Sequence, residues 1–121
     1  MTARTDRRLA PRARTPDGMH LRFPGLAEPA VVRDLSTSGV CCTMEQTLPL
    51  LSQVQVTFLL PSDGPERPTS SREVTCTGAV VRCARAGARY ETAIFFTSVD
   101  DEDREALERY VTSLRRAGQV A

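Results

Sequence analysis

Apolar and polar side chains alternate along most of the chain from Met19 onward, which is the pattern of half-buried β-strands. The alternation predicts six strands, at residues 19–23, 30–35, 40–44, 54–60, 74–82 and 90–96. Turn-forming residues separate them, and residues 61–73, with three prolines and no apolar side chain, predict a long exposed hairpin loop. Short strands with regular turn signals favour a small antiparallel barrel or sandwich.

The spacing of apolar residues changes after residue 100, from two to three and four, which predicts an amphipathic helix. The apolar residues with this spacing are Ala106, Leu107, Tyr110, Val111 and Leu114. Acidic side chains crowd the first predicted turn and arginines the last, as the helix dipole favours. We therefore expect one mainly β domain over residues 19–117, with a C-terminal helix at about 100–117.

The first eighteen residues differ from the rest because they are rich in arginine and poor in apolar side chains. We interpret residues 1–18 as a flexible Arg-rich leader. The formal net charge is only +1, so the chain is not a globally basic nucleic-acid binder, although its charge is uneven. All sixteen basic residues are arginine, a bias that GC-rich coding explains, so an arginine spacing by itself carries little weight. Indeed, the spacing RxxxR occurs at Arg4/Arg8, at Arg8/Arg12 and again at Arg85/Arg89.

Composition also narrows the class of protein. No apolar run approaches the roughly twenty residues of a membrane span, and no apolar stretch follows the basic N-terminus as in a signal peptide, so we expect a cytoplasmic protein. The four cysteines lack metal-ligand spacing and are expected to be structural thiols, with at most one of Cys41 and Cys42 in the core. A single histidine, His20, and the absence of nucleophile-elbow or P-loop motifs argue against an enzyme, a metal site or a cofactor.

Two short segments carry the most specific signal: Arg8-Leu-Ala-Pro-Arg12, and Asp34-Leu-Ser-Thr-Ser-Gly39 in the turn after the second predicted strand. In this order they resemble the RxxxR and (D/N)xSxxG motifs of PilZ domains. Softer similarities extend over nearly the whole chain, through Leu60-Pro61, Gly78–Arg82 and the strand at Ala93 to the acidic helix. The resemblance implies a six-stranded antiparallel β-barrel with a C-terminal α-helix, in agreement with the pattern.

The resemblance also implies a function, as a non-enzymatic receptor for cyclic di-GMP. Arg8 and Arg12 would clamp guanine and phosphate with their planar forks, and Arg7 is a further candidate. Asp34 would accept from guanine N–H groups, Ser36 would offer its hydroxyl, and Gly39 would adopt a positive φ or let the ligand approach. Ligand binding would order the leader and signal to an unidentified partner protein.

Two other functions stay open. The first is a PilZ-like adaptor that binds motility or pilus machinery without nucleotide, although such members typically lack the motif residues present here. The second is a basic-tailed RNA or DNA binder, which the core-like positions of the aromatic residues disfavour. The sequence does not identify the regulated process or the partner, and it leaves monomer or homodimer, and one or two bound nucleotides, open.

Overall fold

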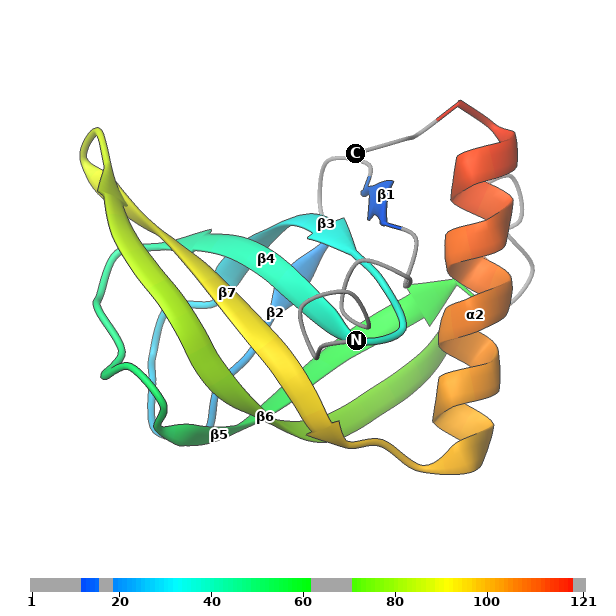
Figure 1. Ribbon diagram of the computed structural model, residues 1–121, viewed down its shortest axis with the longest axis horizontal. Helices are drawn as coiled ribbons and strands as arrows, with labels where there is room; N and C mark the ends of the chain where they lie inside the picture. Colours follow the sequence, from blue (N-terminus) through cyan, green and yellow to red (C-terminus); the bar gives the residue numbers. More distant parts are fainter. Residues whose placement is uncertain (1–11, 16–18, 62–70, 119–121) are drawn as a thin grey trace, which may run out of the picture.

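The computed structural model describes residues 12–15, 19–61 and 71–118 of the chain. One antiparallel sheet curls into a barrel-like body, and the C-terminal helix packs across one end of it (Figure 1). The elements are β1 (Ala13–Arg14), β2 (His20–Leu21), β3 (Ala30–Leu35), β4 (Gly39–Met44), β5 (Gln53–Pro61), β6 (Ser71–Ala86), β7 (Arg89–Ser98) and α2 (Asp101–Arg116). The predicted mainly β fold with one C-terminal helix is confirmed.

The sheet has the strand order β1-β3-β4-β7-β6-β5, and β2 pairs with β3 beside it. Its two ends meet where Arg22, directly after β2, bridges Thr57 on β5. The N–H of each residue donates to the carbonyl of the other, over 2.9 and 3.0 Å. These two hydrogen bonds join the two sides of the curled sheet at this point.

The inward-facing side chains of the strands and one face of α2 form a single core. From α2 come the apolar residues that the helical spacing predicted, all buried. Facing them are strand residues such as Val56, Phe58, Val80 and Ile94, each at most 2% exposed. Full burial of one such side chain stabilises the fold by ~1.5–3 kcal/mol, so this core fixes the barrel on which the outer face is built.

The start of the chain differs from the prediction. Residues 19–23 form only the two-residue strand β2 and the Arg22 bridge, and β1 lies within the predicted leader. Ala13 is fully buried and pairs with Leu35, and the Thr15 hydroxyl donates to the Val32 carbonyl over 2.9 Å. The sheet thus begins before residue 19, and the described part of the leader belongs to it. A lone alanine among arginines gives no alternation from which β1 could be predicted.

The other boundaries fall close to their predicted positions. β3 has the predicted bounds, and α2 is one residue shorter at each end than the predicted helix. β6 and β7 extend their predicted strands to a hairpin turn at Gly87, whose φ of +66° suits glycine. Residues 62–70 of the predicted loop and residues 1–11 and 16–18 of the predicted leader lie outside the described residues. No helix in the described part of the chain is long and apolar enough to cross a membrane.

Candidate functional site

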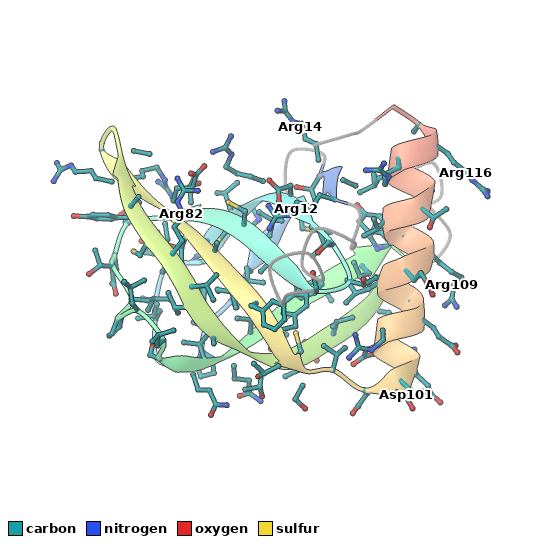
Figure 2. The ribbon with its side chains drawn as sticks, in the orientation of Figure 1. Arg12, Arg14, Arg82, Asp101, Arg109 and Arg116 are labelled. Carbon is teal, nitrogen blue, oxygen red and sulfur yellow. The ribbon has the colours of Figure 1, made fainter. Side chains whose placement is uncertain are left out.

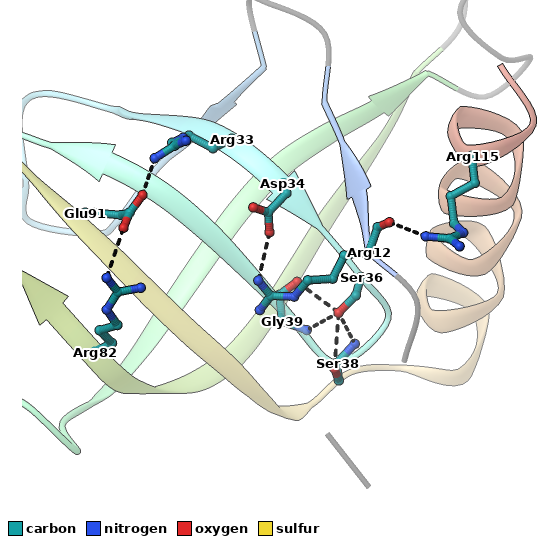
Figure 3. A network of polar contacts seen from close by, with 9 residues as sticks. All are labelled: Arg12, Arg33, Asp34, Ser36, Ser38, Gly39, Arg82, Glu91 and Arg115. Carbon is teal, nitrogen blue, oxygen red and sulfur yellow. Dashed lines mark hydrogen bonds and ion pairs between the residues drawn. The ribbon is translucent and has the colours of Figure 1, made fainter. Parts of the chain in front are cut away.

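A β-bulge in β3 shapes the outer face of the sheet near the second motif. Val32 pairs with Cys42 and Asp34 with Cys41, so Arg33 is an extra residue between them. Such a bulge breaks the strict alternation of side chains and redirects them locally. Here Arg33 is exposed and Asp34 is partly buried, and both make ion pairs on the outer face (Figure 3).

Asp34 is ion-paired with Arg12, so the structure brings the two sequence motifs together. Arg12 Nη1 lies 3.1 Å from Asp34 Oδ1, and β1 pairs with β3 in the register Arg14 to Asp34. A second contact fixes the backbone of Arg12, because Arg115 Nη1 in the last turn of α2 donates to the Arg12 carbonyl over 2.6 Å. Burial raises the pKa of the Asp34 carboxyl above its ordinary value, and the Arg12 and Arg33 guanidinium groups partly offset this.

The Ser36 hydroxyl organises the turn that follows. The Ser36 Oγ accepts hydrogen bonds from the backbone N–H groups of Ser38 and Gly39, each over 3.1 Å. The Ser36 N–H in turn donates to the Gly39 carbonyl over 2.9 Å. Ser36 is only 1% exposed. Its side chain therefore holds the turn from inside.

Gly39 lacks the positive φ that was one of its two expected roles, and the other role, close approach of the ligand, stays a prediction. Among the described glycines, those with a positive φ are Gly25, Gly87 and Gly118, so Gly39 does not need a left-handed backbone. A Cβ atom at Gly39 would lie 2.5 Å from the carbonyl oxygen of Ile94 on β7. The absent side chain thus lets β4 approach β7, and the expectation of a positive φ at Gly39 was wrong. Together, Ser36 and Gly39 fix the turn beside Asp34.

A second charged group lies on the same face and was not predicted. Glu91 on β7 makes an ion pair with Arg33 through one carboxylate oxygen, and its other oxygen lies 3.3 Å from Arg82 Nη2 on β6 (Figure 3). Arg82 follows a second bulge, since Val80 pairs with Ile94 and Arg82 with Ala93. Strand alternation alone does not reveal this group, because its three members meet through cross-strand register and two bulges.

Cys41 lies between the two charged groups. Both Cys41 and its neighbour Cys42 are buried, at 6% and 0% exposure, although only Cys42 belongs to the connected core cluster. Burial raises the pKa of the Cys41 thiol, and the carboxylates of Asp34 and Glu91 raise it further. Arg33 and Arg12 act on it in the opposite direction. The Arg12–Asp34 pair and the Arg33–Glu91 pair thus both influence the pKa of the Cys41 thiol, which remains protonated at neutral pH.

The third RxxxR pair and two arginines of α2 lie away from Asp34. Arg85 and Arg89 flank the β6–β7 hairpin turn, where Arg85 Nε donates to the Gly87 carbonyl and Arg89 pairs with Glu45. Figure 2 shows Arg109 and Arg116 on the outer side of α2, away from the sheet. Arg7 and Arg8 lie outside the described residues, so their placement stays a prediction. Of the RxxxR pairs, Arg8/Arg12 has a member beside Asp34.

Other kinds of site have less support. Within the described residues, no cluster of three or more His, Cys, Asp or Glu side chains is arranged to hold a metal ion. A cavity of about 310 Å³ lies at the seam between β2 and β5, lined by Met19, His20, Arg22, Pro29, Phe58 and Leu59. None of the motif residues lines this cavity. The outer face of β3, β4, β7 and β6 is therefore the candidate functional site.

Comparison with known proteins identifies the family and the fold. A family model for the PilZ domain matches residues 6–113. Among solved structures, that of the Bacillus subtilis inhibitor of motility (MotI/DgrA) is similar, with a TM-score of 0.72 and 12% sequence identity. The similarity covers 90% of this chain and 50% of that one, so the chain spans half the length of this relative. At such low identity the likeness shows the fold alone. No match was found among curated protein sequences.

Proposed function

The chain belongs to the PilZ domain family of cyclic di-GMP receptors, and on this premise we propose that it binds cyclic di-GMP on the outer face of its barrel. The ligand would lie between the arginines of Arg8-Leu-Ala-Pro-Arg12 and the turn from Asp34 to Gly39. The protein would bind the dinucleotide without changing it and would pass the signal to a partner protein. We further propose that it acts in the cytoplasm.

The observation that carries the proposal is the ion pair between Arg12 and Asp34. These residues belong to two motifs that are separate in the sequence, and a receptor needs both at one place. The ionised Asp34 carboxylate is an acceptor for the N1–H and N2–H groups of guanine. The Arg12 side chain is about half exposed, so its fork has donors available for a phosphate oxygen or the guanine O6/N7 edge.

Within this proposal the motif residues have two kinds of role, direct contact with the ligand and support of the turn. Asp34, Arg12 and Arg8 would make the direct contacts in this proposal. Ser36 and Gly39 would act mainly by holding the turn, because the Ser36 hydroxyl is bonded internally and Gly39 packs on β7. The contact between Arg115 and the Arg12 carbonyl offers a route by which a bound ligand could influence the end of α2.

A second candidate function is a nucleotide-independent adaptor for a protein partner. One observation favours it: Asp34 is ion-paired with Arg12 and the Ser36 hydroxyl is bonded within its turn, so both serve the fold itself. In this alternative the motif residues would be structural, and a partner would recognise another surface of the barrel.

Isothermal titration of the purified chain with cyclic di-GMP separates the two functions, with GTP and cyclic di-AMP as controls. The receptor proposal requires saturable binding of cyclic di-GMP that is lost in Asp34→Ala and retained in Arg85→Ala. No heat of binding at high ligand concentration, for a chain with a cooperative thermal transition, would reject the receptor and favour the adaptor.

A further inference from the structure

Two β-bulges face each other across the outer surface of the sheet. One, at Arg33 in β3, sets Arg33 and Asp34 on that face. The other, at Val81 in β6, precedes Arg82, whose side chain reaches Glu91. Because bulges are frequent beside binding sites, where they redirect side chains, the pair marks the surface between β3 and β6.

Small side chains occupy the strands between the bulges. The cross-strand register runs from Asp34 to Cys41, from Cys41 to Ala93, and from Ala93 to Arg82. Three strand spacings of about 4.8 Å place the backbones of Asp34 and Arg82 roughly 14 Å apart. Because the side chains of Cys41 and Ala93 are short, they project little from the middle of this row. The carboxylate of Asp34 lies at one end and the guanidinium group of Arg82 at the other. A planar, polar-edged molecule fits such a surface.

Glu91 holds Arg82 in place at one end of the row and also pairs with Arg33, which lies beside Asp34 at the other end. Its carboxylate makes ion pairs with both Arg33 and Arg82 and is mostly buried, with 20% of the side chain exposed. The Arg82 side chain is 61% exposed and makes its ion pair over 3.3 Å through Nη2. Since a guanidinium group carries five N–H donors, most of those of Arg82 remain available to a ligand.

Guanine has hydrogen-bonding groups that match both ends of this row. Its N1–H and N2–H groups are donors that suit the Asp34 carboxylate, and its O6 and N7 atoms are acceptors that suit an arginine fork. Adenine carries an acceptor at N1, where Asp34 needs a donor, and a donor at N6 in place of O6, so beside Arg82 it keeps only the N7 acceptor.

We propose that Arg82, held by Glu91, reads the O6/N7 edge of a guanine that lies over Cys41 and Ala93 with its N1–H and N2–H groups on Asp34. This inference rests on the proposed function and adds to it a specificity-determining residue outside both sequence motifs. Arg33, held by the same carboxylate, adds positive charge beside the ligand.

The test compares cyclic di-GMP with cyclic di-AMP by titration against the wild-type chain and the Arg82→Ala, Arg82→Lys and Ala93→Leu variants. We expect Arg82→Ala to weaken cyclic di-GMP binding at least tenfold and to lower the preference over cyclic di-AMP by a similar factor. Arg82→Lys keeps the charge but loses the bidentate fork, so it should restore affinity at low salt without restoring the preference. Ala93→Leu should obstruct the floor and weaken binding at least tenfold.

Matched controls come from the β6–β7 hairpin. Arg85→Ala removes an arginine from the same strand, and Ala86→Leu enlarges an exposed alanine at its end. Both should bind like the wild type, and thermal unfolding identifies any variant that fails to fold. If the wild type binds no cyclic di-GMP, the proposed function fails and this inference with it. If the wild type binds and the Arg82 and Ala93 variants keep its affinity and preference, only the reading by Arg82 is overturned.

Discussion

Arg12 and Asp34, 22 residues apart in the chain, are joined by an ion pair with an Nη1–Oδ1 distance of 3.1 Å. Because the Arg12 side chain is about half exposed, solvent screens this pair, and its contribution to stability is small, about 0–1 kcal/mol. The pair therefore matters more for placement than for stability. It sets a fork of N–H donors beside a carboxylate on a rigid strand, so that a ligand would meet both at once.

Replacement of Asp34 should remove ligand binding without unfolding the protein. The carboxylate is partly buried at a cost that Arg12 only partly offsets, so Asp34→Asn should leave the thermal midpoint nearly unchanged. An asparagine presents one acceptor and an added donor to the guanine N–H groups, so affinity for cyclic di-GMP should fall at least tenfold. Titration with thermal unfolding of the same samples checks both effects. Full affinity in Asp34→Asn would exclude Asp34 as the acceptor.

The leader arginines should be needed for binding in a position-specific way. Arg12→Ala and Arg8→Ala should each weaken cyclic di-GMP binding at least tenfold, because a charge-assisted contact contributes ~1.5–3 kcal/mol and ~1.4 kcal/mol is a factor of ten. The matched control is Arg85→Ala, which has the same RxxxR spacing but lies at the β6–β7 hairpin beside Tyr90. A loss in Arg85→Ala, with wild-type affinity in the other two variants, would show that the motif was assigned to the wrong pair.

Periodicity predicted the elements that span the core, because a buried face must repeat its apolar residues at the period of its backbone. It thus located β3 and the buried face of α2 correctly. It missed β1, where burial of the single residue Ala13 leaves no repeat to detect. The motifs identified Arg12 and Asp34. A sequence motif alone does not distinguish a side chain that contacts a ligand from one that stabilises a turn, as Ser36 does.

The charged group of Arg33, Glu91 and Arg82 could not be predicted from the sequence, for a different reason. Glu91 and Arg82 lie on separate strands, and their meeting with Arg33 depends on the register of four strands and on two bulges. A bulge shifts alternation by one residue, so the side on which Arg82 lies does not follow from the pattern alone. Cross-strand pairing supplies this information once the sheet is known.

The turn after β3 should be sensitive to small changes. Ser36→Ala leaves the N–H groups of Ser38 and Gly39 without their hydroxyl acceptor, at a cost of ~1–3 kcal/mol. Gly39→Ala forces a Cβ against the Ile94 carbonyl, and overpacking of this kind costs ~1–3 kcal/mol. Both should lower the midpoint of thermal unfolding and weaken ligand binding, whereas Thr37→Ala in the same turn should do neither. Unchanged stability in Ser36→Ala would contradict the turn-holding role.

Arg115 should affect the ligand site from a distance, because its guanidinium group holds the Arg12 carbonyl over 2.6 Å. Arg115→Ala should weaken cyclic di-GMP binding severalfold, through looser placement of Arg12, and should barely change thermal stability. Arg116→Ala is the matched control, since Arg116 belongs to the same helical turn but lies on its outer side (Figure 2). Equal affinities for the two variants would mean that the helix end does not position Arg12.

Binding should depend on pH through Asp34. Burial raises the pKa of this carboxyl above the ordinary 3.8, so the folded protein takes up the proton at a higher pH than an exposed aspartate would. A protonated carboxyl is a poor acceptor for guanine N–H groups, so affinity should fall as the pH is lowered through the raised pKa. The folded chain also binds more protons than the unfolded chain within this window. The contribution of Asp34 to stability therefore falls, rather than rises, as the pH increases from 3.8 through the folded-state pKa.

Titrations with cyclic di-GMP from about pH 4 to about pH 8 measure the effect on binding. Arg12 lowers the pKa of Asp34, so Arg12→Ala should move the loss of the remaining affinity to a higher pH. Asp34→Asn has no proton to gain at this position, so its weak binding should vary little over the same range. If the wild type and Asp34→Asn show the same pH dependence, another group controls it. The ionised Asp34 carboxylate would then not be the acceptor for guanine.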